Sequence, residues 1–342
     1  MQTKRINLAL QGGGAHGAFT WGVLDRLLDE DWLEIAAISG TSAGALNGAA
    51  LKAGLVTGGR DGARANLRAL WERVGGVGDL RAMGWFRPFL PSASMTAMAA
   101  QVSETLMPVS PADLAAQVIS PYDWGPLWRN PLAPVVDAFR LEEVCAHEGP
   151  RLFVAATNAH TGKVRVFTGH DVTREAILAS ACLPTLFQAV EIDGQAYWDG
   201  GYSGNPALHP LYDPSLPDDL LIVSINPQFR PDAPESAPEI LNRINEISFN
   251  AALLRDLRAI HFVKRLLAEG SLTPGAMKDV LVHMIADDVL MRGLSARSKI
   301  APTPMLLDTL FRAGRTAADG FLSAHGEDIG RRGSVDLVQM FG

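Results

Sequence analysis

The first 54 residues alternate twice between an apolar strand pattern, a tight glycine-containing turn and a helix pattern, and this alternation restricts the fold more than any other feature. Residues 6–11 predict a buried strand, and residues 35–39 predict a second one. Apolar side chains recur at helical spacing over 17–29, and a helix of small residues is expected over 43–52, ending at Gly54. Strands that alternate with helices in this way are typical of a parallel α/β sheet.

The rest of the chain continues this pattern after one irregular stretch. Residues 84–137 are rich in proline, tryptophan and phenylalanine and have weak periodicity, so they are either an irregular insertion packed on the sheet or a cap that forms an acyl-chain wall over a site. Further strands are expected at 151–157, 163–168, 188–192, 220–225 and 279–285, and helices at 63–74, 173–182, 238–269 and 304–324.

Composition and charge exclude several classes of protein. The net charge is −7 and no run of Lys and Arg could follow a phosphate backbone, so no nucleic-acid partner is expected. The chain has only two cysteines, and it has neither a signal-peptide core nor an apolar stretch of the ~20 residues that span a bilayer. We therefore expect a cytoplasmic protein, with binding to a membrane surface left open. No metal-ligand spacing is present, so no metal or cofactor is expected. The sequence does not reveal the oligomeric state, and a homodimer is one option.

The most specific local motif is Gly40-Thr41-Ser42-Ala43-Gly44, which lies between a predicted strand and a predicted helix. In that context G-x-S-x-G forms a tight turn that presents the serine hydroxyl at the edge of a sheet. The start of the following helix favours developing negative charge near the serine. Ser42 is therefore the candidate nucleophile, and the alternative is a glycine-rich packing turn.

A second motif, Gly12-Gly13-Gly14-Ala15-His16-Gly17, also connects a strand to a helix. Its glycines allow successive backbone N–H groups to face one small volume, as in an oxyanion hole. The same letters match the dinucleotide fingerprint G-x-G-x-x-G, which requires an acidic residue at the end of the next strand. Here Glu34 lies at the beginning of that strand and the Ser42 turn lies at its end, so the oxyanion hole is favoured.

A third motif, Asp199-Gly200-Gly201, provides a candidate base for Ser42. By itself Asp-Gly is a common turn dipeptide, so the assignment depends on the other two motifs. No histidine lies in a motif that selects it as the third member of a triad. A carboxylate also needs a pKa above its usual value of about 4 to accept a hydroxyl proton, which burial in an apolar pocket can supply.

Together these three motifs, in this order, make the chain resemble the bacterial patatin-like phospholipases. Residues 179–184, Ala-Ser-Ala-Cys-Leu-Pro, are similar to the Ala-Ser-x-Ala-x-Pro segment of that family. Residues 120–123 with 130–132 resemble a stretch common in its bacterial members. The similarity extends from residue 5 to about residue 226, and the region 227–342 carries no motif that we can assign.

The resemblance implies a three-layer α/β/α patatin-like fold (the FabD/lysophospholipase-like type) around a mainly parallel sheet. It implies a catalytic core at 5–226 with a mostly helical part, 227–342, packed on the same domain. It also implies a Ser42–Asp199 dyad that works through an acyl-enzyme on a lipid or ester substrate, which the chain could reach at a membrane surface. The oxyanion hole would be formed by Gly12, Gly13, Gly14 and Ala43.

The supporting motif residues are His16, Gly17, Gly40, Gly44, Gly200 and Gly201. One departure is His16, because the family often has Arg or Lys at that position. If a cation orients the glycine turn there, His16 does so more weakly or only when protonated. The expected reaction is that of a phospholipase A, a lysophospholipase or a general esterase. Acyl transfer and non-catalytic lipid binding are the alternatives.

Overall fold

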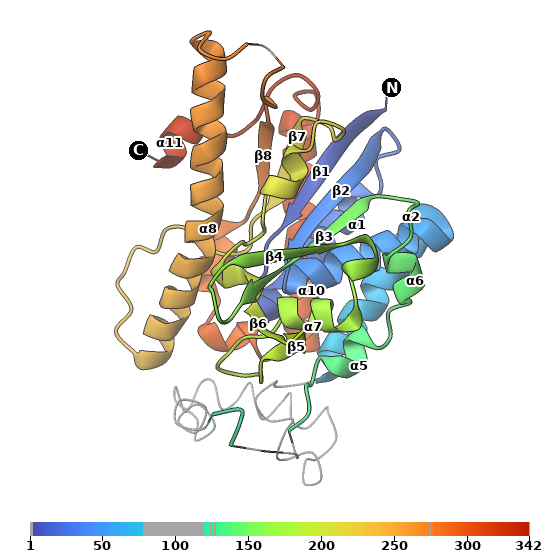
Figure 1. Ribbon diagram of the computed structural model, residues 1–342, viewed down its shortest axis with the longest axis vertical. Coiled ribbons are helices and arrows are strands. Elements are labelled where there is room, and N and C mark those ends of the chain that lie inside the picture. The colour runs from blue at the N-terminus through green and yellow to red at the C-terminus, as the bar shows by residue number, and fades with distance from the viewer. Residues whose placement is uncertain (1–2, 78–119, 124, 126–127, 274, 342) are drawn as a thin grey trace.

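The computed structural model describes residues 3–77, 120–123, 125, 128–273 and 275–341, and these form a mixed α/β fold around one sheet (Figure 1). The strand order is β5-β6-β3-β2-β1-β7-β8, with β4 paired to β3 as well. The pairs that join β3, β2, β1, β7 and β8 are parallel, whereas β4 and β6 run antiparallel to β3. The strands are β1 (Lys4–Leu10), β2 (Leu33–Thr41), β3 (Arg151–Asn158), β4 (Val164–Thr168), β5 (Val190–Ile192), β6 (Gln195–Asp199), β7 (Asp219–Val223) and β8 (Leu281–Ile285).

Helices cover both faces of the sheet because successive strand residues point to opposite faces. In β1, Leu8 and Leu10 pack in the core formed with α1, α2, α7 and α10, whereas Ala9 packs in the core formed with α8 and α11. Figure 1 shows α8 on one side of the sheet and α2 on the other. The longer helices are α1 (Gly17–Leu27), α2 (Ala43–Val77), α8 (Ala237–Ala268) and α10 (Pro304–His325). The shorter ones are α5 (Ala133–Val136), α6 (Leu141–Val144), α7 (Arg174–Ser180), α9 (Asp288–Gly293) and α11 (Leu337–Phe341), with 3₁₀ turns η1 (Gly14–His16), η3 (Gly169–Asp171), η4 (Gly200–Tyr202), η5 (His209–Tyr212) and η6 (Ala296–Lys299).

The mixed α/β fold with a mainly parallel sheet is confirmed, and one helix boundary was wrong. The helix that begins at Ala43 does not end at Gly54; it continues to Gly58 and Gly59, whose backbone is non-helical, and α2 then resumes to Val77. Gly54 has a different role, because a Cβ there would lie 2.4 Å from the carbonyl oxygen of Gly62. Its missing side chain allows the two segments of α2 to approach each other.

Two further outcomes concern less regular parts of the chain. The short helices α5 and α6 were not expected from the sequence. Most of the 84–137 stretch, predicted to be an insertion or a cap, lies outside the described residues. Among the residues that are described, no helix combines the length and the hydropathy that a membrane crossing requires.

Candidate active site

Ser42 occupies a sharp turn between the end of β2 and the start of α2. Its φ is +55°, a left-handed conformation that is rare for a residue with a side chain and typical of a strained nucleophile turn. Gly40 and Gly44 make this turn sterically feasible: a Cβ on Gly44 would lie 2.1 Å from the carbonyl oxygen of Leu10, and one on Gly40 would lie 2.5 Å from that of Gly44. The backbone N–H of Ser42 donates to Ser180 Oγ at 2.9 Å, which fixes the turn against α7.

The strand register brings Asp199 to Ser42. Thr41, the last residue of β2, pairs with Ala155 of β3, and Asp199, the last residue of β6, pairs with the next residue, Ala156. Since β4 occupies the other edge of β3 at both positions, β2 and β6 lie end to end along the same edge. The two motifs, 157 positions apart in the chain (199 − 42), therefore meet where these two strands end.

The environment of Asp199 changes its acidity. The side chain accepts a hydrogen bond from the backbone N–H of Gly201 at 2.8 Å, and the Ser42 hydroxyl lies beside it. Burial raises the pKa of Asp199 to about 7, although the Gly201 amide and the Ser42 hydroxyl act in the opposite direction by favouring the carboxylate. The neighbouring Tyr197 is buried, whereas Trp198 is 37% exposed.

The glycine turn passes directly beside Ser42. A Cβ on Gly12 would lie 2.7 Å from the Cβ of Ser42, so only glycine fits at that position. The backbone N–H of Gly12 donates to Asn205 Oδ1 at 2.6 Å and is therefore not free to bind an oxyanion. Within the described part of the chain, the N–H groups of Gly13, Gly14 and Ala43 have no hydrogen-bond acceptor. These three amides are the ones that remain available to a ligand.

Comparison of the sequence with family models identifies the family of this chain. A family model described as patatin-like phospholipase matches residues 8–212, more than half of the 342-residue chain, and the matched segment contains all three motifs. The chain belongs to the patatin-like phospholipase family. This is a family of lipid ester hydrolases.

Comparisons with individual proteins add little to the family assignment. No curated protein matches the chain. The crystal structure of VipD from Legionella pneumophila is similar at 15% identity and a TM-score of 0.40, covering 94% of this chain and 67% of VipD. The type III effector protein ExoU is similar at 15% identity and a TM-score of 0.35, covering 94% of this chain and 53% of ExoU. Likeness at this level says nothing about the substrate.

Several polar residues that were not assigned a role from the sequence hold the turns around Ser42. Gln11 Oε1, at the end of β1, accepts hydrogen bonds from the backbone N–H groups of Ile225 and Asn226 at 2.9 and 3.2 Å. Asn205 and Ser180 bind the amides of Gly12 and Ser42. A signal for Gln11 is present in the sequence, because a glutamine at the end of an apolar strand needs buried partners. Ser180 lies in the Ala-Ser-Ala-Cys-Leu-Pro segment that resembles the family, whereas Asn205 lies in an irregular stretch without such a signal.

His16 is neutral in this environment. Burial and the nearby charge of Lys299 lower the pKa of His16 to about 3. Ser298 Oγ donates its proton to the carbonyl oxygen of Ser295 at 2.6 Å, so it accepts the hydrogen bond from His16 Nε2 at 2.7 Å. His16 Nδ1 is then a bare acceptor, buried and without a partner in the described part of the protein. The positive charge near the glycine turn therefore comes from Lys299 and not from His16.

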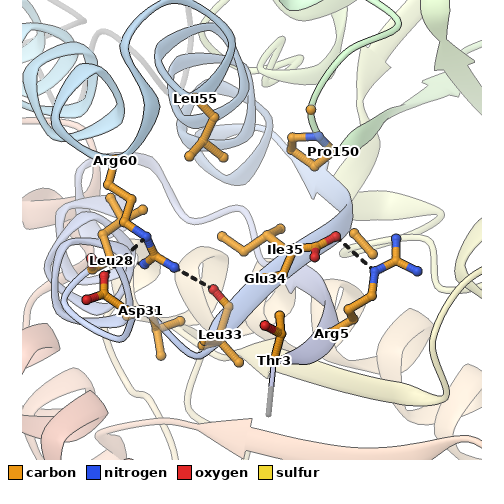
Figure 2. Close-up of a pocket in the computed structure, with 13 residues that line it drawn as sticks. Thr3, Arg5, Leu28, Asp31, Leu33, Glu34, Ile35, Leu55, Arg60 and Pro150 are labelled. Carbon is orange, nitrogen blue, oxygen red and sulfur yellow. Dashed lines mark hydrogen bonds and ion pairs between the residues drawn. The ribbon is translucent and has the colours of Figure 1, made fainter. Parts of the chain in front are cut away.

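A separate pocket of about 480 Å³ lies at the other ends of β1 and β2, away from Ser42 (Figure 2). Its charged side chains are already paired: Arg5 contacts Glu34 at 2.9 Å, and Arg60 donates to the carbonyl oxygens of Leu28 and Leu33. Among the described residues that line this pocket, none is a Ser, Cys or His. Across the described ranges, no group of three or more His, Cys, Asp or Glu side chains is arranged to hold a metal ion.

Proposed function

We propose that this chain is a serine acyl hydrolase that cleaves carboxylic ester bonds of lipids, as a phospholipase A, a lysophospholipase or an esterase. Ser42 is the nucleophile and Asp199 is its general base. The observation that carries the proposal is the position of the Ser42 hydroxyl beside a buried carboxylate whose pKa is raised to about 7. A base that titrates near neutral pH combines the correct protonation state with a useful affinity for the proton.

In the first step, Asp199 accepts the proton of Ser42 as Ser42 Oγ forms a bond to the ester carbonyl carbon. The carbonyl π-bond electrons move to the oxygen, which becomes an oxyanion. The amides of Gly13, Gly14 and Ala43 are the proposed donors to this oxyanion. Each such donor is worth roughly 3–4 kcal/mol of transition-state stabilisation in enzymes where one has been removed.

Collapse of the tetrahedral intermediate breaks the bond to the leaving alcohol, which takes the proton from Asp199. Water then attacks the acyl-Ser42 ester while Asp199 accepts a proton from it, and Asp199 returns this proton to Ser42 Oγ as the bond to the acyl group breaks and the fatty acid is released. Water is the acceptor in this proposal. An added alcohol that captured most of the acyl groups would change the assignment to acyl transfer.

The test is hydrolysis of a soluble chromogenic ester and of phospholipid and lysophospholipid micelles by the purified protein. We expect Ser42→Ala to lower kcat by about 10⁴-fold or more, and Asp199→Asn to lower it by about 10²- to 10⁴-fold. Circular dichroism and thermal unfolding of each variant check that the fold is retained. A folded Ser42→Ala protein with wild-type turnover would exclude Ser42 as the nucleophile.

A further inference from the structure

The glycine turn is held from outside the segment that matches the family, residues 8–212. On one side it contacts η6. A Cβ on Gly14 would lie 2.2 Å from the backbone carbonyl oxygen of Lys299, so the two backbones are in direct contact. The adjacent Ser298 accepts the hydrogen bond from His16. The first residue of the 3₁₀ turn η1, Gly14, therefore contacts Lys299, and its last residue, His16, contacts Ser298.

On its other side, the glycine turn contacts the loop that follows β7. Asn226 Nδ2 donates to the carbonyl oxygen of Gly12 at 2.7 Å. A Cβ on Gly13 would lie 2.9 Å from Ile225 Cδ1. Asn250 of α8 holds this loop by donating to the carbonyl oxygen of Asn226 at 3.3 Å. Movement of either η6 or this loop would therefore displace the amides proposed to bind the oxyanion.

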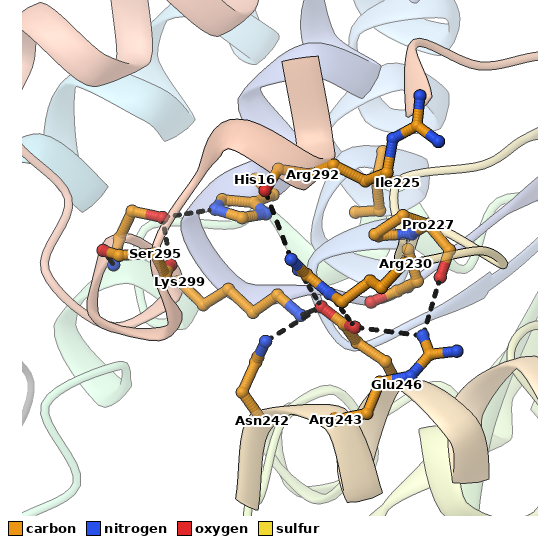
Figure 3. Close-up of polar contacts among 12 residues, drawn as sticks. His16, Ile225, Pro227, Arg230, Asn242, Arg243, Glu246, Arg292, Ser295 and Lys299 are labelled. Atoms are coloured by element: carbon orange, nitrogen blue, oxygen red, sulfur yellow. Dashed lines mark hydrogen bonds and ion pairs between the residues drawn. The ribbon is translucent and has the colours of Figure 1, made fainter. Parts of the chain in front are cut away.

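Both supports meet at one buried carboxylate, Glu246 of α8 (Figure 3). Arg230, from the loop after β7, donates to both of its oxygens at 2.8 Å. Lys299 of η6 contacts it at 3.1 Å, and Arg243 contacts it at 3.3 Å. Asn242 adds a hydrogen bond at 2.9 Å. Figure 3 shows these four side chains pointing toward the Glu246 carboxylate.

We propose that Glu246 is a positioning residue that holds the oxyanion-binding glycine turn by joining η6 to the loop after β7. The inference rests on the proposed function. Three cations surround Glu246, so the site has an excess of two positive charges even when the carboxylate is ionised. Without the carboxylate, Arg230 and Lys299 repel each other across a poorly solvated site, and the segments that carry them separate.

The charge of Glu246 fits this role. Burial alone would raise its pKa, but the hydrogen bonds and charges of Arg230 and Lys299 outweigh burial and lower the pKa of Glu246 to about 2. The carboxylate therefore stays ionised over the whole pH range in which an esterase would be assayed. A neutral glutamine at this position keeps the size of the side chain and removes the charge.

The experiment compares Glu246→Gln with the wild type on para-nitrophenyl butyrate, a neutral soluble ester, and measures inhibition by an alkyl trifluoromethyl ketone. This ketone adds to the nucleophilic serine and forms an oxyanion that resembles the tetrahedral intermediate. We expect kcat to fall by about 10- to 100-fold, KM to change by less than about 3-fold, and the inhibition constant to rise in proportion to the loss of kcat/KM. Titration of active sites corrects each value for unfolded protein.

A matched control separates positioning from stability. Asp219 is also a buried carboxylate, but it lies at the opposite end of the sheet, where it contacts His283 at 3.0 Å and the backbone N–H of Gly330 at 2.8 Å. We expect Asp219→Asn to lower the melting temperature while kcat and the inhibition constant per active site stay at wild-type values. If Glu246→Gln behaves in the same way as Asp219→Asn, the positioning role is overturned.

A second variant keeps the proposal testable if Glu246→Gln fails to fold. Lys299→Met leaves Glu246 paired with Arg230 and Arg243 but frees η6, so we expect a loss of kcat of about 5- to 10-fold with a matching weakening of ketone binding. Lys299→Arg should restore both. Wild-type values for Lys299→Met would overturn the proposal. A wild-type protein that hydrolyses no ester would instead overturn the proposed function, and the positioning role with it.

Discussion

The carboxyl group of Asp199 is buried beside the Ser42 hydroxyl, so its titration should be visible in catalysis. Because only the carboxylate accepts a proton and the pKa of Asp199 is raised to about 7, kcat/KM should rise about tenfold per pH unit below pH 6 and level off above pH 7 to 8. The measurement is the pH profile of kcat/KM with an uncharged ester. A profile that levels off near pH 4 would contradict the assigned pKa.

His16 provides a control for this profile, because an inflection near pH 7 is also what an ordinary histidine gives. The pKa of His16 is lowered to about 3 by burial and by Lys299, which is outside the range of the inflection. We therefore expect His16→Gln to leave the inflection in place, whatever its effect on the absolute rate. An inflection that disappears in His16→Gln would assign the titration to the imidazole.

Burial of Asp199 should also cost stability. The pKa of Asp199 is about 7 in the folded protein and 3.8, the ordinary value of an exposed Asp, in the unfolded chain. Its contribution to stability is therefore fully present below about pH 4 and is lost as the pH rises through 7. Asp199→Asn removes this titration. We expect the variant to be more stable than the wild type at pH 8, by at most about 4 kcal/mol, and the difference to shrink toward pH 4. Unfolding in urea at pH 8 and pH 5 measures it, and a variant less stable than the wild type at pH 8 would contradict the burial cost.

At the level of single residues, the sequence predicted those whose chemistry needs a recognisable turn. Ser42, Asp199 and the glycine turn each lie between a strand and a following helix or 3₁₀ turn, and glycines mark these turns. Glu246 could not be found in this way. Its partners Arg230 and Lys299 are 16 and 53 positions away, and only the packing of α8 brings the three together.

Among the elements, the turn that carries Ser42 depends on close contact between the start of α2 and the end of β1. A Cβ at position 44 would lie 2.1 Å from the carbonyl oxygen of Leu10, which is backbone and cannot move aside. Gly44→Ala should therefore destabilise the protein by at least about 2–3 kcal/mol. Gly58→Ala, at the non-helical break within α2 and with no atom within 4 Å of the added Cβ, is the control and should have little effect. Thermal unfolding compares the two, and equal melting temperatures would contradict the close contact.

Element types were predictable where the periodicity was strong, as in β1, α1, β3 and α10, which all lie close to the expected ranges. The course of α2 was not, because Gly54 and the pair Gly58-Gly59 are equally good helix-ending signals in the sequence. The structure uses the pair to break the helix and Gly54 for close packing with Gly62. Tertiary contact decided between two local signals of similar strength.

At the scale of the whole molecule, the region 227–342 completes both layers that cover the sheet. β8 pairs with β7, and Leu253 and Leu257 of α8 lie in the core on one face. On the other face α10 packs so closely on α1 that a Cβ on Gly22 would lie 1.9 Å from the carbonyl oxygen of Phe311. We predict that the two regions form one folding unit.

A chain ended after residue 226 tests this prediction. It would retain all three motifs but expose apolar surface on both faces of the sheet. We expect it to lack a cooperative thermal transition and the near-ultraviolet dichroism of a packed core, and to lack esterase activity. A truncated chain that unfolds cooperatively would show instead that residues 5–226 fold independently.

The most direct test of the central claim is to map the residue that a fluorophosphonate probe modifies, using mass spectrometry of the digested protein. Such a probe forms a covalent bond only with an activated serine oxygen. The account predicts one adduct, on Ser42, at a rate that falls by at least about 10²-fold in Asp199→Asn. A folded wild-type protein in which Ser42 stays unmodified, or in which Asp199→Asn reacts as fast as the wild type, would contradict it.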